Sequence, residues 1–345
     1  MDFSLFDHKN SLLLPAYNKP HPDEIFSSWL VRLSYAHYLK AHTFSKHVFN
    51  SVSIWNRDID RKFSDEKIKM ITQRTNTTFK EVSDCFLASY EGRLFLECKL
   101  KTNSKWILPL GIYHRIRKKN GFMFCPLCLK HDGQDPYYRK SWRISLNIVC
   151  THCKSYLQDC CPKCKMPVIF YRLDLGDKRN TPDKKISLCF NCKFDLSNAE
   201  IIFADAIHFK IQSYFNNILL EGLNQEIFYP HLFFDVLYHF CKLINSKSPP
   251  GLIIRKKLNN ELNLNYYPVH INNSNLFENI GIEDRIKTLT GAYFLINNWP
   301  NDFINFFTGT NIWSSFLLKD LKDIPYWYKS LIIDNFFVSN INRHF

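Results

Sequence analysis

Eight of the 12 cysteines form four Cys-x-x-Cys pairs between positions 125 and 192. Two residues between paired thiols let one tight turn direct both sulfurs at a single metal ion, and four thiolates complete the tetrahedral sphere that zinc prefers. The intervals 129–149 and 165–188 are long enough to return a second pair by a hairpin. The simplest assignment is two consecutive zinc ribbons that hold two structural zinc ions, the first bound by Cys125, Cys128, Cys150 and Cys153 and the second by Cys161, Cys164, Cys189 and Cys192.

The alternative use of these thiols is disulfide bonding. The opening segment 1–11 is charged and lacks a secretory h-region, so we expect a reducing cytoplasm, where thiols stay free or bind metal. Two neighbours leave the ligand sets open, because Cys160 adjoins Cys161 and His152 adjoins Cys153. The other cysteines are expected to be buried thiols: Cys85, Cys98 and Cys241. Four protein ligands leave no position for a reactive water, so both zinc ions are expected to be structural.

Composition predicts a globular protein with more than one core. The chain has 345 residues, of which 46% are hydrophobic and 16% aromatic, too apolar for a disordered protein. The most apolar long stretch, 227–244, is interrupted by Pro230, Asp235 and Lys242. It is therefore expected to form a buried helix, and no membrane partner is predicted.

The basic charge predicts a polyanionic partner. The formal net charge is +13, and the stretch from Lys99 to Arg143 holds eleven Lys and Arg against two acidic residues. Aromatic residues that can stack on bases are interleaved with them. We predict contact with double-stranded DNA here; the alternative is a solvated basic surface over packed aromatics. The candidate contact residues are Arg115, Arg117, Lys118, Lys119, Arg139, Lys140 and Arg143.

The sequence predicts an α-rich multidomain fold in three regions. A helical domain spans 1–97, a double zinc-ribbon domain spans 98–200, and a C-terminal helical domain spans 201–345. Within the first region, helices are expected at 65–74 and 79–90, joined by a short turn, with Thr78 and Glu81 as a capping box. This pair is helix-turn-helix-like, with 79–90 as the recognition-like helix; the alternative is an ordinary packing unit.

The last region is expected to be helical at 204–222, 230–245 and 281–298, because apolar residues recur there at helical spacing. The Pro249-Pro250 dipeptide predicts a break in the chain. In the zinc region, 173–185 is expected to be an exposed hairpin tip.

No catalytic signature is found in the sequence. It has no phosphate-binding G-x-x-x-x-G-K-[ST] loop, no H-E-x-x-H helix and no G-x-S-x-G elbow. We therefore expect a protein that is not an enzyme, although scattered carboxylates leave a metal-dependent nuclease open.

These motifs together resemble the TniQ family, which includes the TnsD-type target selectors of bacterial transposons. The resemblance covers about residues 14–164 and rests on four segments: LP…PHPDEIFSSWLVRLS at 14–34, WNRDIDR at 55–61, FCPLCL with YYRKSWR at 124–143, and CTHC with CPKC at 150–164. One departure is that Cys153 stands where the family commonly has histidine. Zinc binding survives this change, and a role for His152 becomes less expected.

The resemblance implies a non-catalytic adaptor of transposition. Such proteins recognise target DNA directly, or a DNA-bound RNA-guided CRISPR effector, and recruit the transposon's AAA+ ATPase (TnsC/TniB type). The compact length modestly favours docking on a guide complex. The alternative is a zinc-ribbon, sequence-specific DNA-binding regulator unrelated to transposition. The sequence leaves open whether the chain forms a homodimer.

Overall fold

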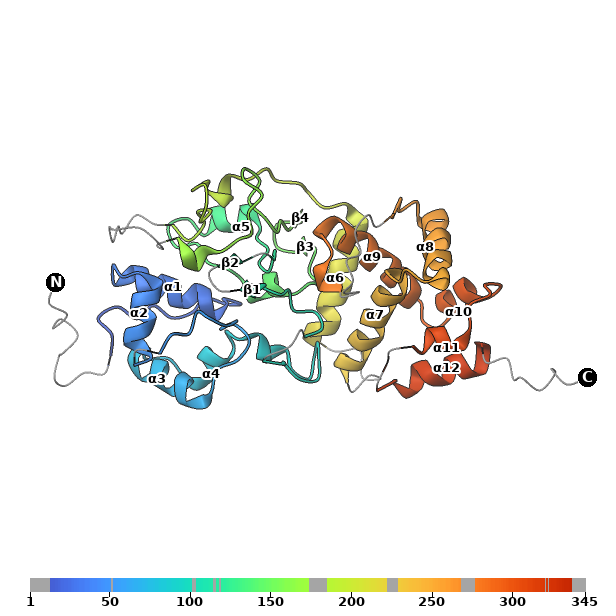
Figure 1. Cartoon of the computed structure of the whole chain (residues 1–345), viewed down its shortest axis with the longest axis horizontal. Helices are drawn as coiled ribbons and strands as arrows, with labels where there is room; N and C mark the ends of the chain where they lie inside the picture. The colour runs from blue at the N-terminus through green and yellow to red at the C-terminus, as the bar shows by residue number, and fades with distance from the viewer. Residues whose placement is uncertain are drawn as a thin grey trace, which may run out of the picture. The chain divides into compact units, whose positions relative to one another are not determined.

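The chain folds into two compact units in the computed structural model (Figure 1). The first comprises residues 1–91 and 97–204, and the second 92–96 and 205–345. The division of the first unit at residue 97 stays a prediction, since the helical and cysteine-rich regions are packed together there. The structure describes residues 13–50, 52–100, 104–113, 116–117, 119–173, 185–221, 229–267, 277–319, 321 and 323–336.

The first unit combines short helices with two-stranded hairpins. Both β-pairs are antiparallel, with Ile112 opposite Arg117 in one and Cys150 opposite Ser155 in the other. The α-helices and strands are α1 (Phe26–Ala36), α2 (Ala41–Val48), α3 (Asp65–Thr75), α4 (Phe79–Ser83), β1 (Ile112–Tyr113), β2 (Ile116–Arg117), α5 (Pro126–His131), β3 (Val149–Cys150) and β4 (Ser155–Tyr156). The 3₁₀ helices are η2 (Leu87–Tyr90), η3 (Lys140–Arg143), η4 (Phe170–Arg172) and η5 (Leu196–Asn198).

Helix α1 lies in the core of this unit and is buried along most of its length. Its apolar residues pack against aromatic rings from later segments; Phe26, for example, stacks on Phe86 with a centroid separation of 4.6 Å. The adjacent Ser27 and Ser28 are also buried. They are tolerated because their hydroxyls donate hydrogen bonds to Asp60 and Glu24.

The helix pair at 65–90 is only partly as predicted. Helix α3 matches the expected 65–74, and the capping box of Thr78 and Glu81 at the start of α4 is confirmed. The predicted continuous helix over 79–90 is wrong, because α4 ends at Ser83. The chain leaves the helix to pair with other segments: Cys85 accepts the Phe26 N–H, and Leu87 donates to the Asp60 carbonyl. These tertiary hydrogen bonds override the local helix pattern.

A buried ion-pair cluster ties the cysteine-rich region to the helices before it. The Arg143 guanidinium is fully buried and donates to both oxygens of Asp58, at 3.2 and 2.7 Å, and to Asp60 at 3.1 Å. Burial, with the nearby Asp58 charge and despite Arg143, raises the pKa of Asp60 to about 7. Although burial acts the other way, Arg143 holds the pKa of Asp58 below its usual range.

Two further contacts join the same regions. Arg32 on α1 bridges Glu24, at 2.6 Å, and Asp135 from the cysteine-rich region. The Lys140 ammonium is bonded to the Asp84 carbonyl and, at 2.7 Å, to the Ser89 hydroxyl. The charged residues of the resemblance segments thus hold one another inside this unit.

The second unit is helical, as the sequence predicts. It comprises α6 (Ala206–Glu221), α7 (Pro230–Ile244), α8 (Pro249–Leu262), η6 (Phe277–Asn279), α9 (Ile282–Ile296), α10 (Asn301–Phe307), α11 (Ser314–Leu317) and α12 (Tyr326–Phe336). Helices α7 and α9 form its centre, where Phe240 stacks on Phe303 from α10 at 5.3 Å.

The prolines at 249 and 250 begin a helix that the sequence reading missed. They occupy the first turn of α8, where a missing N–H is harmless. Arg255 of α8 donates to the carbonyls of Ile244, at 2.5 Å, and Ser246, at 2.7 Å, and so satisfies the C-terminal end of α7. Among the described residues, no helix is long and apolar enough to span a membrane.

Replacing Arg143 by alanine is expected to destabilise the first unit by about 3–5 kcal/mol, because Asp58 and Asp60 lose a buried partner. The change is measured as the free energy of unfolding in urea. The control is Lys80→Ala, which removes an exposed pair with Asp84 and should change stability by no more than about 0.5 kcal/mol. Equal stability of the two variants would show that the buried cluster is not a structural anchor.

Candidate metal centres

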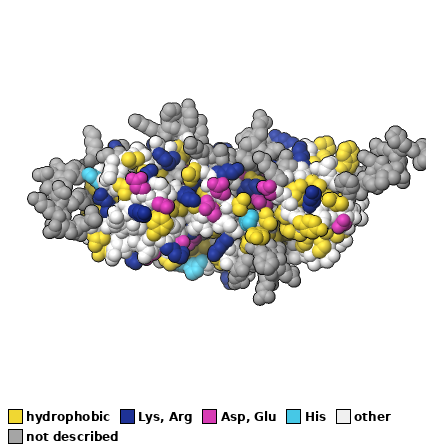
Figure 2. All heavy atoms as spheres, turned by 90° about the horizontal axis from the view of Figure 1, so that it is seen from below, with side chains coloured by type: hydrophobic (Ala, Val, Ile, Leu, Met, Phe, Trp, Pro, Cys, Tyr) yellow, Lys and Arg dark blue, Asp and Glu magenta, His cyan; other side chains and the backbone are white. Residues whose placement is uncertain are grey.

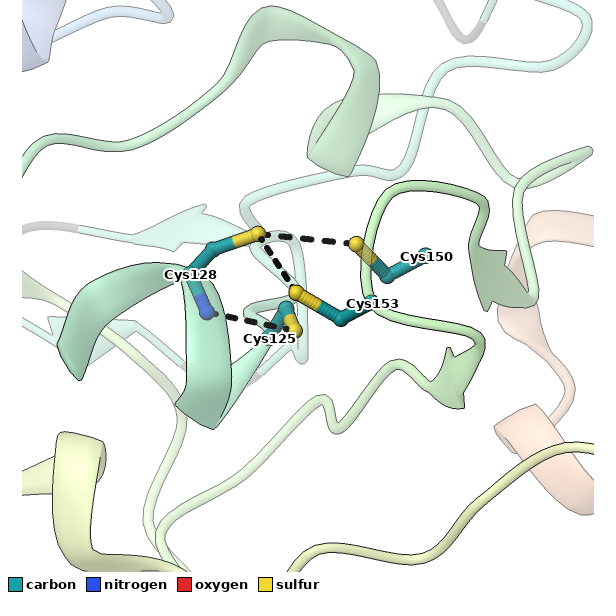
Figure 3. A group of neighbouring side chains, drawn as sticks. All are labelled: Cys125, Cys128, Cys150 and Cys153. Atoms are coloured by element: carbon teal, nitrogen blue, oxygen red, sulfur yellow. Dashed lines mark hydrogen bonds between the residues drawn. The ribbon is translucent and has the colours of Figure 1, made fainter. Parts of the chain in front are cut away.

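The structure brings the first four predicted ligands together. The ligand atoms of Cys125, Cys128, Cys150 and Cys153 all lie within 4.8 Å of one another. The Cys128 sulfur is 3.5 Å from both the Cys150 and Cys153 sulfurs (Figure 3). One pair comes from the N-terminus of α5, where Cys125 is the N-cap, and the other from the β3–β4 hairpin. The first ligand pair therefore lies at the start of a helix.

The second set of four forms a separate cluster. Its ligand atoms also lie within 4.8 Å of one another, with the Cys161 sulfur 3.6 Å from Cys192 and the Cys164 sulfur 3.6 Å from Cys189. Two similar loops face each other here, each closed by an isolated β-bridge, Cys160 with Pro167 and Leu188 with Asp195. The predicted pairing into two consecutive four-thiol sets is thus reproduced by the fold.

The sulfur separations fit zinc and exclude disulfides. A disulfide requires about 2.05 Å between sulfurs, and all eight thiols are free. Ligands at about 2.3 Å around a tetrahedral zinc ion lie about 3.8 Å apart, close to the observed 3.5–3.6 Å. Two structural zinc ions are therefore the cofactors that these residues fit.

Backbone N–H groups converge on the sulfurs in all four pairs. The first cysteine of each pair accepts a hydrogen bond from the backbone N–H of the second: Cys125 from Cys128, Cys150 from Cys153, Cys161 from Cys164 and Cys189 from Cys192. Such bonds favour a thiolate, but burial outweighs them and raises the pKa of Cys161 and Cys189, and the hydrogen bond with Cys125 raises the pKa of Cys150. Hydrogen bonds with Cys128 and Cys150 hold the pKa of Cys125 well below its usual range. Although burial opposes it, hydrogen bonding to Met166 and Asn191 lowers the pKa of Cys164 to about 6.

A left-handed lysine follows three of the four pairs. Lys154, Lys165 and Lys193 have φ values of 53°, 59° and 59°. In the second cluster, the residues after each pair donate back to the first cysteine, from Lys165 N to Cys161 O at 2.8 Å and from Lys193 N to Cys189 O at 3.0 Å. The remaining pair, Cys125 and Cys128, differs because Cys128 already lies inside α5. Glycine would be the ordinary residue at these positions, so a left-handed conformation could not be predicted from the lysines.

The structure decides whether Cys160 replaces Cys161, or His152 replaces Cys153, as a ligand. Cys161 belongs to the second cluster, whereas Cys160 does not, and burial raises its pKa. Cys153 belongs to the first cluster, and His152 instead lies beside it in a further group with His131. Cys85, Cys98 and Cys241 are buried, as predicted.

Four of the seven predicted DNA contacts have described side chains, and two of these four are buried. Arg143 is fully buried and Lys140 is 9% exposed. Arg139 is paired with Asp132 at 2.6 Å and lies over the Tyr137 ring at 3.8 Å. Lys119 is exposed. Arg115, Lys118 and the side chain of Arg117 lie outside the described residues.

The structure also assigns roles that sequence reasoning missed. Asp58, Asp60 and Glu24 are buried partners of arginines. These acidic residues belong to the segments PHPDE and WNRDIDR, which also carry the resemblance to the TniQ family. The closeness of His131 to Cys153 had no local signal, because the two residues come from different segments.

Fold and donor sets together define a helix-rich, zinc-binding protein. The TniQ family model matches residues 15–157, which confirms the resemblance over this part of the chain. The match contains the buried ion pairs of Arg32 and Arg143 and the first zinc cluster, and it ends before the second cluster. No curated protein matches the chain.

The adjacent cysteines at 160 and 161 provide a matched test of the ligand assignment. Cys161→Ser should leave one bound zinc ion and unfold the second cluster, because structural zinc contributes about 10–16 kcal/mol of apparent binding free energy in small sites. Cys160→Ser should retain two. Zinc content per protein is measured by plasma mass spectrometry. Two zinc ions in a folded Cys161→Ser protein would contradict the assignment.

The left-handed lysines give a conformational test. At Lys165, valine should be less stable than glycine by about 1–2 kcal/mol, because a β-branched residue is poorly accommodated at positive φ. Thermal unfolding of the zinc-loaded variants measures the difference. The same two substitutions at the exposed Lys163, which lacks a positive φ, are the control and should differ by less. A larger difference at Lys163 than at Lys165 would refute the conformational argument.

Proposed function

We propose that this protein is a non-catalytic adaptor that selects targets for transposition. It recognises a target, either DNA itself or a DNA-bound RNA-guided CRISPR effector, and recruits the AAA+ ATPase of the transposon. The observation that carries the proposal is the TniQ match across residues 15–157.

The zinc chemistry supports an adaptor rather than an enzyme. Each cluster offers four thiolates to its ion, which fills a tetrahedral coordination sphere and leaves no place for an activated water. The zinc ions then serve to fix loops in place. A rigid scaffold with two saturated metal sites is suited to presenting surfaces to partner macromolecules.

The positions of the basic residues favour docking on a guide complex over direct reading of a DNA sequence. Arg139, Lys140 and Arg143 are engaged within the first unit. Helix α4 has only five residues, and its exposed Lys80 is paired with Asp84 at 2.6 Å. On the face shown in Figure 2, basic and acidic side chains are interspersed. None of these features supplies a recognition helix for the major groove.

Residual DNA contact is assigned to the segment 112–119. Reversing the charges of Arg115 and Lys119 to glutamate should weaken binding to random duplex DNA and reduce the slope of log K against log salt by about two units. The slope is measured by fluorescence anisotropy at several salt concentrations. The control is Lys69→Glu, an exposed lysine of α3, which should leave the slope unchanged. An unchanged slope in the double variant would remove this segment from the proposal.

The decisive experiment presents the zinc-loaded protein with a randomised duplex library, and separately with a purified AAA+ transposition ATPase and an RNA-guided effector bound to DNA. The docking version expects no enriched sequence and a stable complex with effector and ATPase. An enriched sequence together with ATPase binding supports the direct version. An enriched sequence without ATPase binding would overturn the adaptor proposal in favour of a zinc-ribbon transcriptional regulator.

A further inference from the structure

Two histidines lie beside the first zinc cluster without belonging to it. The ring nitrogens of His131 and His152 and the sulfur of Cys153 lie within 4.8 Å of one another. His131 is the last residue of α5, and His152 is in the β3–β4 turn. Zinc-ligand positions fix both segments, since Cys128 lies on the same helix as His131, and Cys150 and Cys153 lie on either side of His152.

Neither histidine has a structural partner to explain its position. Both side chains are exposed, and neither takes part in a hydrogen bond or an ion pair with another residue of the described ranges. By contrast, buried histidines of the chain do have partners; His239 contacts the Leu317 carbonyl at 2.6 Å. Two unengaged imidazoles that meet at a thiol are therefore available for a ligand.

The charge at this place favours a cation. Four thiolates around one zinc ion leave a formal charge of about −2 on the cluster. Three of the four cysteines are buried, and Cys153 is the partly exposed one. Its sulfur keeps lone pairs after binding the inner ion, so the excess negative charge is accessible on the side where His131 and His152 lie.

We propose that His131, His152 and Cys153 form an outer site for a second divalent transition-metal ion, with the Cys153 thiolate bridging the two ions. Two imidazoles and a thiolate suit zinc, cobalt(II) or nickel(II), and not the oxygen-seeking calcium or magnesium. Three protein ligands leave one position for water or for a donor from another molecule. The outer ion is held more weakly than the inner one, because two of its three ligands are exposed.

The test titrates zinc into untagged full-length protein that already holds its two structural ions. Calorimetry and native mass spectrometry should detect a third equivalent in the unmodified protein. In His131→Ala/His152→Ala the affinity for the third zinc ion should fall by more than about 100-fold, because loss of a contact that only supports a ligand already costs up to that much. The two structural zinc ions should remain bound. Cys153 is left intact because its loss would also damage the inner site.

The matched control is Lys130→Ala, an exposed neighbour on α5 that offers no ligand; it should keep the third equivalent. Magnesium is the negative probe and should not bind. The proposal is overturned if the unmodified protein binds only two zinc ions, or if the double histidine variant binds the third as tightly as before. Retention of two zinc ions by the double variant shows that it is folded, so a lost third equivalent cannot be attributed to unfolding.

Discussion

The first unit depends on the burial of Arg143 between Asp58 and Asp60. A fully buried guanidinium is strongly unfavourable unless its charge is matched, and here carboxylates and the Leu108 carbonyl accept hydrogen bonds from its two terminal nitrogens. Its partners come from the segment before α3, while Arg143 itself lies between the two cysteine pairs of the first cluster. The ion pairs of Arg143 with Asp58 and Asp60 therefore fix how the zinc-binding loops are placed against helix α1. Ser27 of this helix donates hydrogen bonds to the same Asp60.

Zinc coordination stabilises the first unit locally, and the buried ion pairs stabilise it between segments far apart in the sequence. In the described part of the cysteine-rich region, the regular elements are the short helix α5, short hairpins and 3₁₀ turns, which bury little surface by themselves. Metal coordination fixes each loop locally, and the N–H groups donated to the sulfurs make that geometry specific. The ion pairs of Arg32 and Arg143 act over longer sequence distances. Loss of one zinc ion should therefore disturb one loop pair, whereas loss of Arg143 disturbs the junction.

The sequence was most informative where chemistry is local. Cys-x-x-Cys spacing is sufficient to predict both thiol clusters, and the capping box located α4 to the residue. It failed where tertiary contacts decide. The residues near Ser83 do not predict the end of α4, because the groups that compete for its backbone hydrogen bonds belong to residues 26 and 60. The proline pair at 249 was read as a break, although proline is equally compatible with the first turn of a helix.

Net charge is likewise a poor guide to function, because it does not distinguish buried cations from exposed ones. A net charge of +13 counts Arg143 and Lys140 equally with an exposed lysine, yet their side chains are consumed by interior contacts and cannot release counterions from DNA. Some of the lysines and arginines between positions 99 and 143 therefore stabilise the first unit from within. The TniQ match over residues 15–157, and not bulk charge, is therefore the stronger argument about function.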